Sequence, residues 1–400
     1  MHKQHRCVIS GIGLATPAGS DLETVWQTLA KGVPLFHPLK VFNNEPSDQW
    51  VACVDDQQLD HNLSKRQLKK LDRFTILSLA AVKGVLQDSQ FPLNDQTRDR
   101  LGILMGNCTG GWSYVEPMMY PLYTEGMQAI NPYVATAWFP AAPQGEISIL
   151  YSIGGYSKTI AGERISAGLA LEQSMWLIER QRLDALLVGG AESPLSALVL
   201  NAFREDGQTS AQNQYRPFSQ EADGYLLGEG AAIVLLESQE QAQARGAKIY
   251  AEVLAIARGM SLEGCLRRCL EIAQLSPQDI DYVLLDGFGT PEKDDEEYHA
   301  LHAVFGNHEQ LAMSSPKSMY GNLVGANMAL DLALACLSLE RQTVLPTCLQ
   351  TGSLKVPPLG QHVVGKSQPR LLNHILVNGR DRDGQSVVVL LGQPASQPLE

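Results

Sequence analysis

The sequence is most informative at residues 216–236, which read RPFSQEADGYLLGEGAAIVLL. The last part, Ala232–Leu236, is an apolar run with the length and composition of a buried β-strand. Similar short apolar runs recur on both sides of it. They are Val8–Ile12, Leu101–Met105, Ala185–Val188, Val253–Ala257, Tyr282–Leu285, Leu371–Val377 and Val387–Leu391.

Helical patterns separate these strands. An apolar stripe runs through Lys65–Asp88, and two further segments, Ser166–Arg182 and Met319–Leu339, are apolar around most of their circumference. The last two are therefore expected to be helices that are buried on every side. Strands that alternate with helices indicate an α/β architecture in which helices cover mostly parallel sheets.

The chain divides into two halves that resemble each other. A polar stretch at 237–246 interrupts two apolar strands, and each half holds a similar segment, LDALLVGG at 183–190 and IDYVLLDG at 280–287. We therefore expect two domains, residues 1–246 and residues 247–400.

The composition excludes several classes of protein. The 400 residues carry a formal net charge of −12, which argues against a nucleic-acid or anionic-membrane partner. No apolar run reaches the roughly 18 residues that a membrane span needs. Seven scattered cysteines do not form a disulfide framework, which favours a reducing, cytoplasmic location. His299 and His302 lack strong further metal ligands, so no metal or cofactor is expected.

Five segments resemble signatures of the β-ketoacyl synthases, and they follow the family order. They are LATPAG at 14–19, LVGGAE at 187–192, RPFSQEADGYLLGEGAA at 216–232, ARGAKIYAE at 244–252 and KSMYGNLVGA at 317–326. Together with weaker matches, the resemblance covers residues from about 7 to 391. It implies a thiolase-like fold, with two duplicated βαβ-rich halves in five αβαβα layers, paired into a dimer.

The resemblance also implies where catalytic groups belong. Active members use a cysteine at a helix N-terminus, two histidines and a lysine. Here Arg164 stands at the cysteine position, Asp286 and Asn322 stand at the histidine positions, and only Lys317 is retained. A guanidinium group cannot carry an acyl chain. We therefore expect that the chain has no catalytic residue and is not an enzyme by itself.

Arg164 and Asp286 replace groups that face each other across the site in active relatives. If the geometry is kept, they should form a buried ion pair, with Lys317 and Asn322 nearby. The glycine-rich gating turn of active relatives is also replaced, by a charged turn at 376–384. These substitutions predict a charged plug in place of a malonyl-binding cavity.

One subgroup, the chain-length factors of type II polyketide systems, resembles the chain more closely. AWFPA at 137–141 and GEISI at 145–149 are similar to their motifs, and Glu163-Arg164 takes the place of their Glu-Gln pair. The resemblance implies an obligate heterodimer with an active ketosynthase, as a component of a 3-oxoacyl-ACP synthase that extends chains bound to an acyl carrier protein. Two alternatives stay open: a stand-alone synthase with altered chemistry, and an acyl-binding or regulatory homodimer.

The same resemblance suggests a substrate tunnel at the subunit interface. Trp112, Val115 and Met119 are spaced i, i+3 and i+7 on one helix face, at positions whose bulk limits tunnel depth in chain-length factors. Trp138 and Phe139 are assigned to the same tunnel and interface. A purely structural apolar stripe is the alternative for these residues.

Overall fold

The computed structural model describes residues 6–40, 46–306, 308–349, 354 and 360–394. Its strands form two blocks of five that follow each other in the chain. The first block contains β1 (Cys7–Ala15), β4 (Leu101–Gly106), β5 (Ser157–Ile160), β6 (Ala185–Glu192) and β7 (Gly230–Ser238). The second contains β8 (Ala251–Gly259), β9 (Tyr282–Leu284), β10 (Ala312–Ser314), β14 (His374–Arg380) and β15 (Ser386–Gly392).

Both blocks have the same topology. Counted along the chain, the strands of each block lie in the order third, second, fourth, fifth, first. The third, second and fourth strands are parallel, whereas the fifth is antiparallel to both of its neighbours. β1 pairs with β8, which joins the blocks into one sheet, and β12 (Gln361–His362) extends the sheet beside β10. The expected α/β fold is confirmed, but the sheet is mixed and not mostly parallel, since five of its ten strand pairings among the described residues are antiparallel. We propose that the two halves meet at residues 246 and 247, between α9 and β8.

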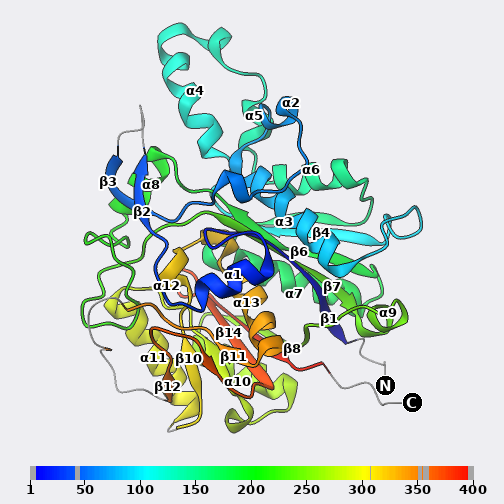
Figure 1. Ribbon diagram of the computed structural model, residues 1–400, viewed down its shortest axis with the longest axis vertical. Coiled ribbons are helices and arrows are strands. Elements are labelled where there is room, and N and C mark those ends of the chain that lie inside the picture. The colour runs from blue at the N-terminus through cyan, green and yellow to red at the C-terminus, as the bar shows by residue number, and fades with distance from the viewer. Residues whose placement is uncertain (1–5, 41–45, 307, 350–353, 355–359, 395–400) are drawn as a thin grey trace.

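Helices complete the layers. α3 (Arg73–Ser89) packs on β1 and β7, and α10 (Leu262–Ala273) packs on β8 and β15. Between the two blocks, α7 (Ser166–Glu179) contacts α13 (Asn327–Arg341). Figure 1 shows this order, with α3 above the sheet of the first block and α10 and α11 (Pro291–Phe305) below that of the second. Every residue of α13 from Asn327 to Leu339 is buried, as its apolar composition predicts.

Shorter elements surround this framework. The remaining helices are α1 (Leu22–Leu29), α2 (Lys65–Leu68), α4 (Trp112–Glu125), α5 (Val134–Trp138), α6 (Ala142–Tyr151), α8 (Ala197–Glu205), α9 (Gln239–Ala244) and α12 (Lys317–Tyr320). Two small sheets pair β2 (His37–Lys40) with β3 (Pro46–Val51) and β11 (Thr343–Val344) with β13 (Gln368–Pro369). α4 projects beyond the layers (Figure 1). None of the helices in the described ranges is both long and apolar enough to cross a membrane.

Three helices differ from the sequence-based expectation. α7, expected to be buried on every side, ends at Glu179 and leaves Trp176 48% exposed. The single helix expected over 65–88 is broken into α2 and α3, because the extended backbone at Asp72 lets its carboxylate accept the Phe74 N–H and cap a new helix. The helix expected over 319–339 is interrupted after Tyr320, where Gly321 has a φ of +89° that disfavours side chains with a Cβ. This turn places Asn322 between two helices instead of inside one.

Candidate functional site

Arg164 and Asp286 lie where the two halves of the molecule meet. Arg164 belongs to a 3₁₀ turn, Glu163–Ile165, that leads directly into α7. Asp286 lies in the loop after β9, and this loop is fixed because the N–H groups of Asp286 and Gly287 donate to the Glu297 carboxylate, at 2.8 and 2.9 Å. Arg164 follows β5 of the first block and Asp286 follows β9 of the second. Each side chain thus lies beyond the carboxyl end of a strand of its own block, and the two approach each other.

The expected contact between Arg164 and Asp286 is present. Arg164 Nη2 lies 3.0 Å from Asp286 Oδ1, and both side chains are only 1% exposed. The Arg164 guanidinium also lies over two rings, 4.2 Å from the Phe288 centroid and 5.5 Å from the Tyr225 centroid. Such cation–π contacts stabilise a cation that has lost its water. Arg164 is thus enclosed by one carboxylate and two aromatic faces.

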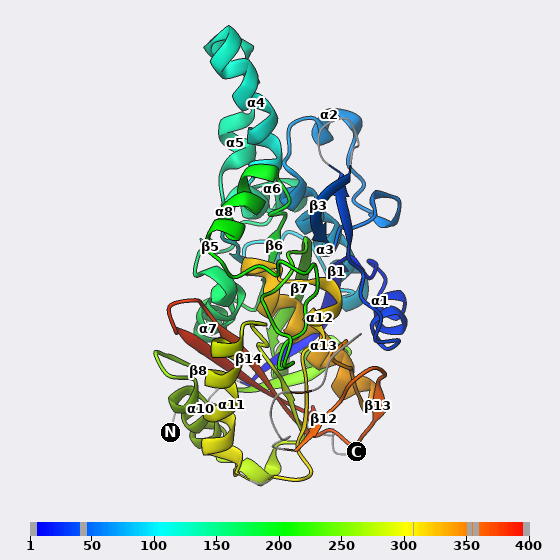
Figure 2. The ribbon, with the colours of Figure 1, turned by 90° about the vertical axis from the view of Figure 1, so that its left-hand side faces the viewer.

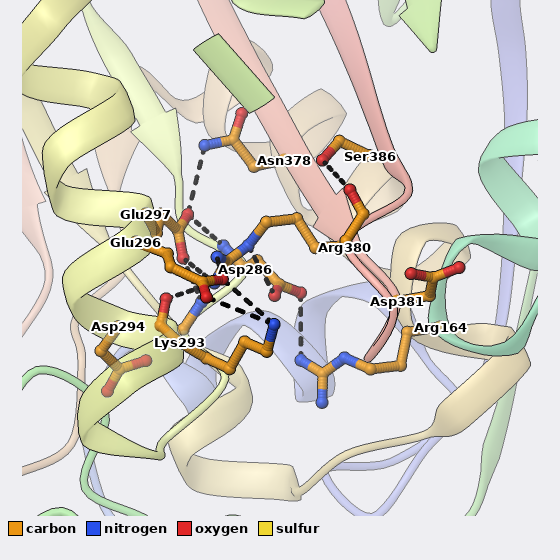
Figure 3. A network of polar contacts seen from close by, with 12 residues as sticks. Arg164, Asp286, Lys293, Asp294, Glu296, Glu297, Asn378, Arg380, Asp381 and Ser386 are labelled. Carbon is orange, nitrogen blue, oxygen red and sulfur yellow. Dashed lines mark hydrogen bonds and ion pairs between the residues drawn. The ribbon is translucent and has the colours of Figure 1, made fainter. Parts of the chain in front are cut away.

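Four more charged side chains complete what we call the Arg164–Asp286 cluster. They are Lys317, Asp331, Arg380 and Glu297. Lys317 Nζ lies 2.7 Å from Asp331 and 3.8 Å from Asp286, and Arg380 lies 3.5 Å from Asp286 and 3.3 Å from Glu297. Figure 3 shows Arg164 and Arg380 converging on Asp286. Three cations face three carboxylates, so the buried charge is balanced.

The ionisation of Asp286 depends on this balance. Burial alone would raise the pKa of Asp286, but Arg164, Lys317 and Arg380 together lower it below its ordinary value. Asp286 is therefore a stable anion at neutral pH. It cannot serve as a proton donor there, and the cluster acts as a fixed set of charges.

Asn322 lies beside the cluster without an ion contact to it. Its Oδ1 accepts the Val324 N–H at 2.9 Å and a hydrogen bond from the Asn327 side chain. Its side chain also interacts with Tyr225. The structure therefore brings Arg164, Asp286 and Lys317 together and uses Asn322 to shape the turn before α13.

The residues assigned to the tunnel lie elsewhere, on α4 and α5. The Trp112 and Trp138 rings meet edge to face, with centroids 6.4 Å apart and planes at 83°. Val115 and Met119 are half-buried on α4, and Phe139 is exposed. This places an aromatic pair and two apolar side chains, Val115 and Met119, next to the surface of the molecule.

Sequence reasoning missed part of the cluster and one thiol beside it. The sequence places Arg380 only in a charged turn. Asp331, a carboxylate within the apolar α13 segment, is the signal in the sequence that a charge is buried near this site. Cys108 follows β4, and its thiol lies near the Glu163 backbone. Burial, together with Glu192 and Glu163, raises the pKa of the Cys108 thiol to about 12. A thiol with that pKa is protonated at neutral pH and is a weak nucleophile.

Two buried carboxyl groups near the site predict a dependence of stability on pH. Asp294 accepts the N–H groups of Phe218 and Gly289, yet burial raises the pKa of Asp294 to about 7. Burial likewise raises the pKa of Glu192 to about 7. Both groups hold their proton more tightly in the folded state, so the stability that they contribute is full at acidic pH and is lost as the pH rises toward 7.

We therefore expect the free energy of unfolding, measured by urea titration, to fall between about pH 5 and pH 7. Asp294→Asn and Glu192→Gln should each reduce this fall, because each removes one titrating group. Asp95→Asn, which changes an exposed carboxylate, is the matched control and should leave the slope unchanged. Equal slopes in all four proteins would contradict the assignment.

Comparison with known proteins identifies the family. Residues 4–242 match the model of the β-ketoacyl synthase N-terminal domain, and residues 242–350 match that of the C-terminal domain. This chain belongs to the β-ketoacyl synthase family. A 3-oxoacyl-[acyl-carrier-protein] synthase 2 from Staphylococcus aureus is 28% identical over 366 residues, which cover 87% of this chain and 88% of that protein.

Two solved structures share the fold over nearly the whole chain. One is the ishigamide ketosynthase/chain length factor, with a TM-score of 0.85 and 24% identity, covering 98% of this chain and 100% of the other. The other is AntDE:AntF, a type II PKS acyl-carrier protein in complex with its ketosynthase, with a TM-score of 0.85, 23% identity and the same coverage. Both support the thiolase-like ketosynthase fold.

The prediction that the chain is not an enzyme by itself is contradicted by these comparisons. The family is one of synthases, and the Staphylococcus aureus relative, which aligns over most of both chains, is named as a synthase. The prediction rested on the residues at three positions.

Proposed function

We propose that this β-ketoacyl synthase family member is the chain-length-determining subunit of a two-subunit ketosynthase. The pair would elongate polyketide or fatty acyl chains, carried by an acyl carrier protein, with malonyl units. The two structural neighbours, one a ketosynthase/chain length factor and the other a complex of a ketosynthase with its acyl-carrier protein, support this choice of partners.

One observation carries the proposal: an exposed apolar face lies beside the residues assigned to the tunnel. Ile149 is 75% exposed, and Trp138, Phe139, Tyr156 and Trp176 are also exposed. Figure 2 shows the elements α4, α5, β5 and α7 along one side of the molecule. Large exposed apolar patches mark protein–protein interfaces.

The open edge of the sheet lies on the same face. β5 is the last strand of the sheet, and within the described residues no strand pairs with its outer edge. An unpaired edge strand can be completed by a strand of another chain. The partner would therefore cover β5 and the neighbouring aromatic side chains, and it would close the space beside Trp112 and Met119.

Pairing can be tested by co-expressing the chain with a β-ketoacyl synthase from the same gene neighbourhood. The two proteins should elute together as a 1:1 complex in size-exclusion chromatography. Ile149→Glu should weaken the complex at least tenfold, because it buries an unpaired charge at the interface. Leu371→Glu is the matched control, since Leu371 is equally exposed at 74% but lies in the second half of the chain. Separate elution of the wild-type proteins would contradict the proposal.

A second candidate, a stand-alone synthase with altered chemistry, would use Cys108, which lies beside the Arg164 turn and would have to lose its proton first, because its pKa is raised to about 12. The two candidates differ in which chain carries the acyl group. In the first it is carried by the partner ketosynthase, and in the second by this chain. Mass spectrometry after incubation with an acyl-loaded carrier protein would detect an acyl group on Cys108 if the second candidate is correct. Stable pairing together with a change in product length would favour the first.

A further inference from the structure

The sequence of helix α4, which carries three of the residues assigned to the tunnel, gives the helix little intrinsic stability. It contains Pro117 and Pro121, whose nitrogens have no hydrogen to donate to the preceding turn. Its N-cap residue, Gly111, makes no side-chain capping bond, and none of its residues is fully buried. Its helical hydrogen bonds are therefore incomplete, and contacts with other elements contribute to holding it in place.

The first turn of α4 is fixed by Asp72. The buried Asp72 Oδ2 accepts the Ser113 hydroxyl and the Tyr114 N–H, both at 2.7 Å, while Oδ1 accepts the Phe74 N–H at 3.0 Å. The Tyr114 hydroxyl also donates to the Lys69 carbonyl, at 2.9 Å. These bonds tie the beginning of α4 to the beginning of α3. They hold one end of α4 without determining its rotation further along.

The second attachment is the Glu116 side chain. Its Oε2 accepts the Ala197 N–H at 2.9 Å, and its Oε1 accepts the Leu198 N–H at 2.8 Å. These are the first two N–H groups of α8, where a carboxylate is favoured by the helix dipole. α8 is anchored in turn by its buried side chains Val199 and Leu200. A single carboxylate therefore joins α4 to a helix that is packed on the protein.

Glu116 lies four residues after Trp112 and three before Met119. It is therefore placed between the first and the last of the α4 residues assigned to the tunnel, which we call the tunnel row (Trp112, Val115 and Met119). A bidentate contact there fixes both the rotation of α4 and the distance of its middle turn from α8. Without it, the remaining attachments of α4 that the structure describes lie at its first turn, through Asp72, Tyr114 and the Trp112–Trp138 contact, and the part from Pro117 onward could pivot. That movement would shift Met119 and leave the first turn in place.

We propose that Glu116 is a positioning residue that sets product length by holding α4 against α8. This inference rests on the proposed function, since it assigns a consequence to the tunnel row. The contact itself does not depend on the partner. The effect of Glu116 on the hydrogen exchange of α4 and its effect on product length can therefore be measured separately.

Hydrogen–deuterium exchange of the chain alone tests the attachment. Glu116→Ala should speed exchange at 118–125 at least tenfold, and Glu116→Gln, which keeps one acceptor oxygen, should have a smaller effect. Glu125→Ala is the matched control, because it removes an exposed carboxylate from the end of the same helix. Unchanged exchange in Glu116→Ala would overturn the proposal.

Product analysis of the reconstituted pair tests the consequence. Glu116→Ala should broaden the product distribution by at least one two-carbon unit, and Glu116→Gln should have an intermediate effect. Glu125→Ala should give the wild-type distribution. The KM for the loaded carrier protein should stay unchanged in all three variants. A wild-type distribution in Glu116→Ala, while Met119→Ala shifts it, would overturn the role of Glu116 alone. Wild-type distributions in both variants would overturn the proposed function together with this role.

Discussion

Replacing Asp286 with alanine is expected to lower the free energy of unfolding by about 3–5 kcal/mol. Asp286 is buried, with the Arg164 guanidinium 3.0 Å away. The other two cations of the cluster keep a carboxylate partner of their own when Asp286 is removed. Arg164 has no second carboxylate within 4 Å among the described residues, so the substitution leaves a buried cation without a counter-charge.

Arg164→Met is expected to cost less than Asp286→Ala. After this substitution Asp286 still lies 3.8 Å from Lys317 and 3.5 Å from Arg380. The double variant should lose less than the sum of the two single variants, because it removes the cation together with its counter-charge. This order of effects distinguishes a shared charge network from a simple loss of packing.

Urea unfolding followed by circular dichroism measures these differences. Arg204→Met is the matched control, because it removes an exposed arginine whose contact with Asp48 spans 3.5 Å. That change should cost less than about 1 kcal/mol. If Asp286→Ala costs no more than this control, the cluster does not stabilise the protein in the way that its geometry indicates.

Replacing Trp112 or Met119 with alanine is expected to lengthen the products of the ketosynthase pair by one or more two-carbon units. Both side chains occupy the row on α4 that we propose to close the tunnel, so their removal frees space for further extension. Trp112→Ala should have the larger effect, since it removes the larger side chain and its edge-to-face contact with Trp138.

Mass spectrometry of the released acyl chains measures this prediction. Trp112→Phe keeps an aromatic ring and should give a smaller shift than Trp112→Ala. Tyr123→Ala serves as the control, because Tyr123 lies on the same helix but is exposed at its far end. Products that lengthen equally in Tyr123→Ala would show that α4 responds to any loss of side-chain bulk, and that Trp112 and Met119 have no special place.

Much of the fold could be predicted from local patterns. Short apolar runs gave the positions of most core strands, and the composition of the α13 segment indicated its burial on all sides. The breaks could not be found in this way, because the helix that begins at Arg73 depends on a capping bond from Asp72. An apolar stripe continues through such a break without any change in its period.

The site was predictable only in part, for a similar reason. The contact between Arg164 and Asp286 follows from their places in two family motifs, which face each other in the fold. The sequence indicates an exposed, charged turn around Arg380 and a solvated helix around Glu297. In the fold, Arg380 ends β14 and contacts Asp286, and Glu297 accepts the Asp286 N–H and contacts Arg380. Cys108 is the cysteine nearest to Arg164 in the sequence, but its place beside the site follows only from the fold, because it approaches from the end of another strand.

The most direct test of the proposed role is photo-crosslinking in the reconstituted pair. The carrier protein would be loaded with an acyl chain that ends in a diazirine, and the crosslinked peptides would be mapped by mass spectrometry. If this chain lines the end of the tunnel, the crosslinks fall on residues 112–119 of α4. Crosslinks that fall only on the other subunit, with none on α4, would contradict that role.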